Sequence, residues 1–246
     1  MKILHISDTH IYEEPHKKLC GVLTRDTLLN VLEIARHREA FDLIIATGDL
    51  SMDGSIDSYK WLREQLNALK VPYYVLPGNH DNFLNLRSVF DLSEKPYPKL
   101  INLRNWKILL LDTQKKGAVY GSLDKIQLER LENFLKRDVA KKTAIFMHHP
   151  AVEVGCDWLD KINLREGKEC FMQLTQSYQV ELIVAGHVHQ ESQFLRGETC
   201  FLTSPSTCAQ FKPQSFDFAV DNSPPGFRVI EFTDENSFHT SVMRVR

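Results

Sequence analysis

Five apolar segments of this 246-residue chain each end in a short polar cluster made of residue types that bind metal ions. The segments occupy residues 3–10, 43–50, 73–81, 144–150 and 182–189. A strand that ends at His, Asp or Asn presents those side chains at the carboxyl edge of its sheet, where open α/β folds place their sites. Because nearly all of these residues offer oxygen or imidazole nitrogen, the pattern predicts a two-metal hydrolytic centre.

The candidate metal ligands have spacings that favour chelation. They are Asp8, His10, Asp49, Asn79, His148, His187 and His189. Asp8 and His10 are two residues apart, so in an extended segment they project to the same side and can bind one ion. His187 and His189 repeat this spacing. Asp49 has two carboxylate oxygens and can therefore bridge two cations.

A structural role is the main alternative for any single histidine. His149 faces away from its neighbour His148 if the strand continues, so we expect it to support the site rather than to ligate a metal. His5 lies inside the first expected strand and is interpreted as a core residue. Three further histidines are assigned to the surface: His16, His37 and His239. A structural role does not explain the ligand set as a whole. Without metal, the negative charge of buried carboxylates that lack cationic partners would remain uncompensated.

Alternating helical and strand patterns position these clusters. Apolar periodicity predicts helices over 24–40, 56–69, 82–90, 122–138 and 165–178. Strands are expected over 2–7, 43–47, 72–76, 107–112, 143–147 and 181–185. Three more strands, over 199–203, 227–233 and 238–245, have little helix between them. We therefore expect a single α/β domain over residues 1–246, in which the C-terminal strands from about 199 to 246 complete a second sheet.

Composition limits the possible classes of function. The chain is 43% hydrophobic, so it can bury a sizeable core, and its formal charge of −2 gives no reason to expect nucleic acid or an anionic membrane as partner. No apolar run reaches transmembrane length, and we expect no signal peptide, since Met1 leads directly into the first expected strand. The five cysteines lack CxxC spacing and are interpreted as reduced thiols. We expect a cytoplasmic protein that is a monomer or a homodimer.

Taken in order, the motifs resemble those of the calcineurin-like metallophosphoesterases. The pattern D-x-H, G-D, G-N-H-D, H and G-H-x-H is filled by residues 8–10, 48–49, 78–81, 148 and 186–189. The resemblance implies a four-layer α/β/β/α sandwich. It also implies that one metal binds Asp8, His10, Asp49 and His189, and that the other binds Asp49, Asn79, His148 and His187, with Asp49 bridging. His80 would be the unligated histidine beside the leaving group.

Further segments, over residues 155–160, 205–213, 217–219 and 225–228, resemble the bacterial class III 3′,5′-cyclic AMP phosphodiesterases. This resemblance covers essentially the entire chain and implies a cyclic nucleotide as the small-molecule substrate. We expect substrate contacts from His10, Asn79, His80, His149, Asn163, His189, Gln210 and Phe211, with Phe211 stacking on a purine. Some relatives place an Asp three residues after the bridging Asp to orient the general-acid histidine. That position here is Met52, with Asp53 beside it, and the role stays unassigned.

The expected reaction needs no protein nucleophile. Two metal ions would bind the non-bridging phosphate oxygens and acidify a bridging water, whose hydroxide would attack the cyclic phosphodiester. The ribose 3′-oxygen would leave with a proton from His80, giving 5′-AMP, while Asp49 holds both ions. We expect Fe or Mn, with Zn or Co as alternatives. The competing hypotheses are a broader metallophosphoesterase, acting on other cyclic nucleotides, phosphodiesters or nucleotide pyrophosphates, and a metal-free protein-binding scaffold.

Overall fold

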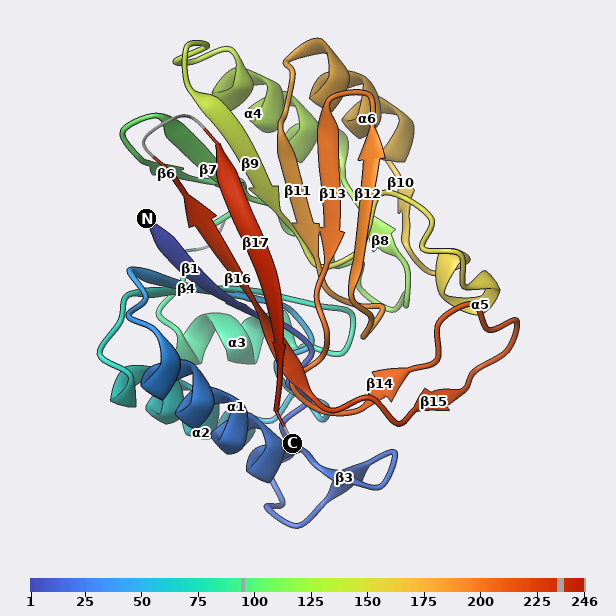
Figure 1. Cartoon of the computed structure of the whole chain (residues 1–246). Coiled ribbons are helices and arrows are strands. Elements are labelled where there is room, and N and C mark those ends of the chain that lie inside the picture. Colours follow the sequence, from blue (N-terminus) through green and yellow to red (C-terminus); the bar gives the residue numbers. More distant parts are fainter. Residues whose placement is uncertain (94–95, 234–236, 246) are drawn as a thin grey trace.

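The computed structural model describes residues 1–93, 96–233 and 237–245, so residue 246, the end of the expected domain, lies outside the described residues. The first of its two large sheets has five strands in the spatial order β17, β16, β1, β4, β5 (Figure 1). These strands are Phe238–Arg244, Gly226–Phe232, Lys2–Ile6, Leu43–Thr47 and Tyr73–Leu76. β1, β4 and β5 run parallel, whereas β16 is antiparallel to both of its neighbours.

The second sheet has six strands in the order β12, β13, β11, β9, β7, β6. They are Ser192–Arg196, Thr199–Thr203, Leu182–Ala185, Lys142–Phe146, Trp106–Leu110 and Lys99–Asn102. The four central strands are parallel and the two edge strands are antiparallel to them. β7, β11 and β13 are buried along their whole length, as parallel strands covered on both faces usually are.

The C-terminal strands are divided between the two sheets, which corrects the expectation that they complete the second sheet alone. β13 joins the second sheet beside β11, but β16 crosses to the first sheet and pairs with β1 from Lys2↔Glu231 to His5↔Arg228. Without β16, the edge of β1 that faces away from β4 would expose its backbone groups. Hydrogen bonding along this edge accounts for the crossing.

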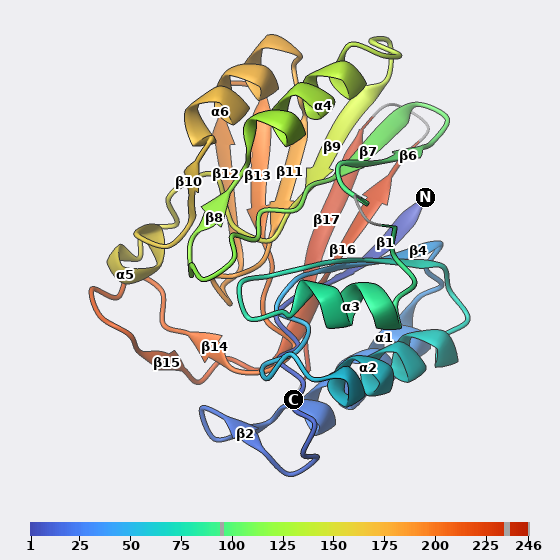
Figure 2. The ribbon, with the colours of Figure 1, turned by 180° about the vertical axis from the view of Figure 1, so that it is seen from behind.

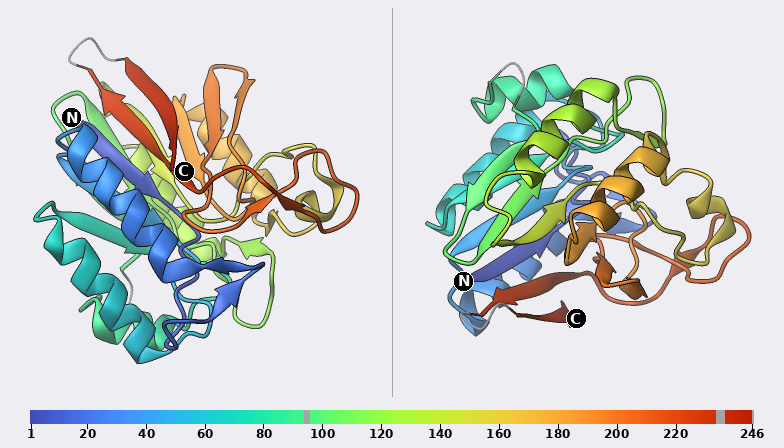
Figure 3. Two further views of the ribbon diagram at one scale, coloured as in Figure 1. Left: turned by 60° about the horizontal axis from the view of Figure 1, so that its bottom comes forward. Right: turned by 90° about the horizontal axis from the view of Figure 1, so that it is seen from above.

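Helices cover the outer face of each sheet (Figures 2 and 3). α1 (Thr24–Arg38), α2 (Ile56–Ala68) and α3 (Phe83–Val89) pack on the first sheet. α4 (Lys125–Leu135) and α6 (Lys168–Ser177) pack on the second. All five lie within the ranges that apolar periodicity predicts.

Alternating strand residues divide most of the apolar interior of the described residues into three main clusters, and a fourth, small cluster lies apart from them. In β4, Ile44 belongs to the cluster that includes α1 and α2, whereas Ile45 belongs to the cluster between the sheets. In β9, Ala144 faces the other sheet and Ile145 packs with α4 and α6. Three apolar clusters between four backbone layers confirm the α/β/β/α sandwich that the family resemblance implies.

Several short elements gather where the parallel strands end (Figure 1), and the sequence pattern does not predict them. They are β2 (Lys18–Leu19) with β3 (Val22–Leu23), β8 (Gly121–Ser122) with β10 (Leu164–Glu166), β14 (Gln210–Phe211) with β15 (Val220–Asp221), and α5 (Asp157–Asp160). Elements of two to four residues are too short for periodicity to separate them from loops. No helix in the described part of the chain is long and apolar enough to cross a membrane.

Candidate metal centre

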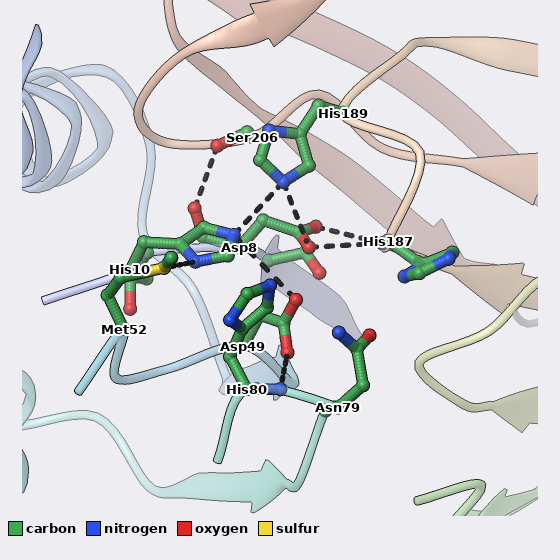
Figure 4. A network of polar contacts seen from close by, with 12 residues as sticks. Asp8, His10, Asp49, Met52, Asn79, His80, His187, His189 and Ser206 are labelled. Atoms are coloured by element: carbon green, nitrogen blue, oxygen red, sulfur yellow. Dashed lines mark hydrogen bonds and ion pairs between the residues drawn. The ribbon is translucent and has the colours of Figure 1, made fainter. Parts of the chain in front are cut away.

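The structure brings all seven candidate ligands to the carboxyl ends of parallel strands. They follow β1 (Asp8 and His10), β4 (Asp49), β5 (Asn79), β9 (His148) and β11 (His187 and His189). β1, β4 and β5 belong to the first sheet and β9 and β11 to the second, so the site lies where the two sheets meet (Figure 4). Apart from Asn79, each of these residues is at most 5% exposed.

Five of the seven candidate ligands have a backbone conformation that residues other than glycine rarely adopt. Their φ angles are positive: Asp8 57°, His10 45°, Asp49 48°, His187 67° and His189 49°. Each such residue costs about 1–2 kcal/mol, and surrounding structure must hold it in place. This finding corrects the expected route to convergence. Asp8 and His10 meet because the chain turns after β1, and not because they share one side of an extended segment.

Two glycines let the ligand loops approach each other closely. A Cβ on Gly48, whose φ is +89°, would lie 2.6 Å from Nδ1 of His148 and 2.8 Å from the backbone nitrogen of Gly78. A Cβ on Gly186 would lie 2.7 Å from Oδ2 of Asp8. Any larger residue at these two positions would push candidate ligands apart.

Asp8, His10 and His189 form one group, with a ligand atom from each within 4.8 Å of the others. Nε2 of His189 lies 3.4 Å from Oδ1 of Asp8 and 3.1 Å from Nε2 of His10. Two imidazole lone pairs repel at this distance unless a proton or a metal ion lies between them. Two nitrogens that each bind one ion at about 2.0–2.1 Å would have a similar separation. The group therefore fits a metal ion.

Asp49 lies between this group and a second one. Its Oδ2 is 3.7 Å from Nε2 of His10 and 3.4 Å from Nε2 of His148. Oδ1 of Asn79 is 3.3 Å from the same nitrogen of His148. Oδ1 of Asp49 accepts the backbone N–H of His80 at 2.9 Å (Figure 4). One carboxylate thus reaches histidines of both expected ligand sets, which is the arrangement that a bridging ligand requires.

His149 forms a third histidine group with His148 and His187, again with ligand atoms within 4.8 Å of one another. Its Nδ1 hydrogen-bonds Oγ1 of Thr113 at 2.8 Å, and its ring centroid lies 4.6 Å from that of His187. Nε2 of His149 and Nε2 of His187 are both buried and have no hydrogen-bond partner among the described residues. His149 is fully buried and does not line the neighbouring cavity, so its expected contact with substrate has no support.

Hydrogen bonds at the outer ring nitrogen orient three of the candidate ligands. The pairs are His148 Nδ1 with the Thr47 carbonyl (2.7 Å), His189 Nδ1 with the Ala209 carbonyl (2.7 Å) and His10 Nδ1 with Sδ of Met52 (3.3 Å). A carbonyl oxygen only accepts, so in the first two pairs Nδ1 carries a proton and the ring is oriented with Nε2 toward the site, where it would bind an ion after losing any proton of its own. Metal-binding histidines are usually held in this way.

Met52 and Asp53 have roles that the sequence leaves open. The sulfur of Met52 contacts His10, whereas the carboxylate of Asp53 accepts backbone N–H groups of nearby loop residues. His80 is exposed, lines the cavity, and lies edge-on to His10 with ring centroids 5.1 Å apart. Its ring therefore faces the cavity beside the candidate ligands, where a proton donor would be useful.

The negative charges of buried carboxylates favour the binding of cations at this site. Burial opposes ionisation of Asp8, but the neighbouring His189 and His148 outweigh it and lower the pKa of Asp8 to about 2. Against the same effect of burial, His148 and His10 hold the pKa of Asp49 well below its usual range. Burial alone would lower the pKa of His148. The charges of Asp49 and Asp8 together have the larger, opposite effect, so the pKa rises from 6.5 to about 9. Two buried carboxylates thus stay ionised at neutral pH, and metal ions would compensate their charge.

Asp81 and Tyr59 connect two of the ligand loops, and we did not single either out from the sequence. The Asp81 carboxylate accepts the backbone N–H groups of Leu50 and Ser51, which follow Asp49, and that of Gly78, which precedes Asn79. It also accepts the Tyr59 hydroxyl at 2.9 Å. Asp81 ends the G-N-H-D motif and could have been found from it. Tyr59 occupies an ordinary apolar position of α2 and gives no such signal.

A cavity of about 270 Å³ opens beside the candidate ligands. Besides Asp49, Asn79 and several of the histidines, its lining is almost entirely apolar: Leu19, Cys20, Met52, Val119, Trp158, Leu159, Ile162, Phe211 and Phe218. A phosphate bound at the candidate ligands would therefore leave the rest of its molecule in an apolar space.

Asn163 and Gln210 do not line this cavity, and their expected contacts with substrate stay predictions. The Asn163 amide nitrogen donates to the carbonyl of Val152 and to Asp160. The Gln210 amide nitrogen donates to two backbone carbonyls, and its oxygen accepts from Arg244 at 2.8 Å. Each residue is only 2% exposed. Both amides are thus used to support loops, which residue type alone does not reveal.

The chain belongs to the calcineurin-like phosphoesterase family. The family model matches residues 1–191, which include all seven candidate ligands. The structure is similar to that of a dimetal phosphatase from Danio rerio, with a TM-score of 0.67 and 16% sequence identity, covering 100% of this chain and 99% of the other. At this identity the similarity concerns the fold, and it agrees with the four-layer sandwich.

Two relatives are similar over the whole chain. One is the 3′,5′-cyclic adenosine monophosphate phosphodiesterase CpdA of Escherichia coli strain K12, which is 37% identical over 247 residues, covering 100% of this chain and 90% of that protein. The other is a 3′,5′-cyclic-nucleotide phosphodiesterase of a Nostoc strain, 35% identical over 246 residues, covering 100% of this chain and 92% of that protein. The similarity therefore continues beyond residue 191 into the segment that carries Phe211 and Phe218.

Proposed function

We propose that this protein is a metal-dependent phosphodiesterase that hydrolyses 3′,5′-cyclic AMP to 5′-AMP. The observation that carries the proposal is the position of Asp49 between two groups of candidate ligands that open onto one apolar cavity. The names of the full-length relatives supply the cyclic nucleotide. An apolar space beside a phosphate site suits a nucleoside better than a small polar alcohol.

The proposed ligand sets follow the two groups. Asp8, His10, Asp49 and His189 would hold one ion, and Asp49, Asn79, His148 and His187 would hold the other. Carboxylate, amide and imidazole donors suit Fe or Mn, which we propose, and also Zn or Co. When bound, the two ions neutralise charge on the phosphoryl oxygens and make water a better nucleophile.

His80 is the proposed general acid. In the reaction, water adds to phosphorus and gives up a proton to solvent, while the bond between phosphorus and the ribose 3′-oxygen breaks. An alkoxide is a poor leaving group, so a proton from the His80 ring to the 3′-oxygen would lower the barrier. The exposure of His80 to the cavity and its place beside His10 support this role. His10, Asn79 and His189 also line the cavity and are the proposed contacts for the phosphate.

Two further properties belong to the same proposal. All five cysteines have free thiols, which is consistent with a reducing compartment such as the cytoplasm. We also propose that residues 1–246 form one domain that acts as a monomer or homodimer.

The competing functions are a broader phosphoesterase and a metal-free binding scaffold. A substrate panel distinguishes them: metal-loaded enzyme is assayed on cyclic AMP, cyclic GMP, bis(p-nitrophenyl) phosphate and a phosphomonoester. We expect kcat/KM for cyclic AMP to exceed that for a small monoester, whose organic group fills less of the apolar cavity than a nucleoside does. A preference for the monoester would support the broader function. Absence of all activity in protein that binds no metal ion would support the scaffold.

A further inference from the structure

Three aromatic rings stand at one side of the cavity, and we call them the aromatic wall. Trp158 comes from α5, Phe211 from β14, and Phe218 from the loop between β14 and β15. Their ring centroids are 5.1 Å (Trp158–Phe211), 5.3 Å (Trp158–Phe218) and 5.5 Å (Phe211–Phe218) apart, with interplanar angles of 67–72°. Each ring therefore meets the other two edge to face.

The aromatic wall is separate from the three main apolar clusters. Trp158 and Phe211 pack in a small cluster of their own, around Cys156, Leu159 and Val188. Phe218 is 58% exposed although it touches both other rings. When a ligand covers a large aromatic side chain that is otherwise exposed to water, the burial of apolar surface stabilises the complex. The wall thus offers an apolar face to a bound molecule.

Phe211 cannot offer its full surface to a base. Its ring lies flat on the ring of His189, with centroids 4.1 Å apart and an interplanar angle of 11°. That face is occupied by a candidate metal ligand, which makes Phe211 a positioning residue for His189. We therefore expect the purine to stack on Trp158 and Phe218 rather than on Phe211.

We propose that Trp158 and Phe218 form a nucleobase subsite, on which the purine of a nucleotide stacks while its phosphate lies at the candidate metal ligands. The inference rests on the proposed function and specifies how its substrate is recognised. Away from the candidate ligands and His80, no charged side chain occurs among the described residues that line the cavity. Recognition of the base then uses stacking on the two rings. The lining also offers the indole N–H of Trp158, which is buried and has no hydrogen-bond partner among the described residues.

The first test compares two inhibitors of the metal-loaded enzyme, 5′-AMP and ribose 5-phosphate, which differ only by the base. Stacking on aromatic side chains should favour 5′-AMP by roughly 5- to 150-fold in inhibition constant. Trp158→Ala and Phe218→Ala should each bring this ratio closer to one. Because both constants are measured on the same preparation, partial misfolding of a variant does not change their ratio. Phe216→Ala is the matched control, since Phe216 is a 68% exposed ring of the same loop that does not line the cavity.

The second test uses fluorescence, because Trp158 is one of only three tryptophans. We expect 5′-AMP to quench the emission of the wild-type enzyme more strongly than ribose 5-phosphate, and this difference to disappear in Trp158→Phe.

An unchanged inhibitor ratio in both alanine variants would overturn the subsite, even in an enzyme that hydrolyses cyclic AMP. An enzyme inactive on cyclic AMP but active on bis(p-nitrophenyl) phosphate would instead overturn the proposed substrate. If the two alanine variants change the sedimentation coefficient and not the ratio, the wall is an interface between copies of the chain and the subsite is wrong.

Discussion

Asp49 is the residue on which both groups of candidate ligands depend. We expect Asp49→Ala to abolish activity and to lose metal from both sites, because the two cations would lose their common counter-charge. Asp49→Asn should be nearly as severe, since the amide keeps the shape but not the charge. Elemental analysis of the purified variants checks this prediction. An inactive Asp49→Ala protein that retains two metal ions per chain would contradict the bridging assignment.

His80 should affect the rate without affecting the metals. If it protonates the leaving oxygen, His80→Ala keeps its fold and its metal content but loses roughly 10²–10⁴-fold in rate on cyclic AMP. The loss should be smaller on bis(p-nitrophenyl) phosphate, whose nitrophenolate leaves readily without a proton. Steady-state kinetics on both substrates provide the measurement. Equal losses would exclude the general-acid role and would favour a contact with phosphate.

Sequence could predict the candidate ligands because their residue types are unusual at strand ends. Asp8 and His148 stand out in this way without any structural information. The left-handed backbone at Asp8 gives no sequence signal, because it is imposed by contacts with loops distant in the chain. For Asn163 and Gln210, residue type does not predict the role. An amide near a site can hold a loop or bind a ligand, and only its hydrogen bonds show which of these roles it has.

The loops that follow the parallel strands form the site by close backbone contact. The Gly48 loop tests this contact, since a Cβ there would lie 2.6 Å from the ring of His148. We expect Gly48→Ala to lower both metal content and kcat by at least about tenfold, because displaced ligands bind metal weakly. Metal titration with a competing chelator measures the first effect and initial rates measure the second.

Gly117→Ala separates this packing effect from backbone strain. Gly117 also has a positive φ, +76°, but nothing lies within 4 Å of the position that its Cβ would take. Its substitution should therefore cost about 1–2 kcal/mol in the free energy of unfolding and leave metal binding unchanged. If the two variants bind metal equally well, contact with His148 is not what requires glycine at position 48.

Helices and central strands could be predicted from periodicity, whereas their assembly could not. The observed α2, Ile56–Ala68, differs by one residue from its predicted range, and β4 coincides with its own. The crossing of β16 to the first sheet depends on pairing between residues more than 220 positions apart, as in Lys2↔Glu231. Local pattern carries no information about such pairs.

At the scale of the whole molecule, a buried polar network joins the two sheets behind the site. His5 is fully buried, and its two ring nitrogens lie 2.6 Å from Oγ of Ser204 and 2.7 Å from Oγ1 of Thr47. Burial, and to a smaller extent the charge of Arg228, lower the pKa of His5 from 6.5 to about 3. The folded protein therefore keeps His5 neutral over a range in which the unfolded chain protonates it.

This shift links stability to pH with a definite sign. Between about pH 6.5 and about pH 3 the unfolded chain binds one more proton at His5, so the free energy of unfolding falls as the pH falls. His5→Gln should reduce the slope by about 1.4 kcal/mol per pH unit in this window. Urea unfolding of metal-free protein at several pH values gives the slope. An unchanged slope would mean that His5 is protonated in the folded protein.

The product formed from cyclic AMP tests the proposed chemistry of the whole molecule most directly. Metal-loaded enzyme is incubated with 3′,5′-cyclic AMP, and the nucleotides are separated by chromatography, with a chelator-treated sample as control. Cleavage of the bond between phosphorus and the 3′-oxygen, assisted by His80, predicts 5′-AMP as the sole nucleotide product. The chelated sample should show no turnover. Release of 3′-AMP, or undiminished hydrolysis after the metals are removed, would contradict the proposed function.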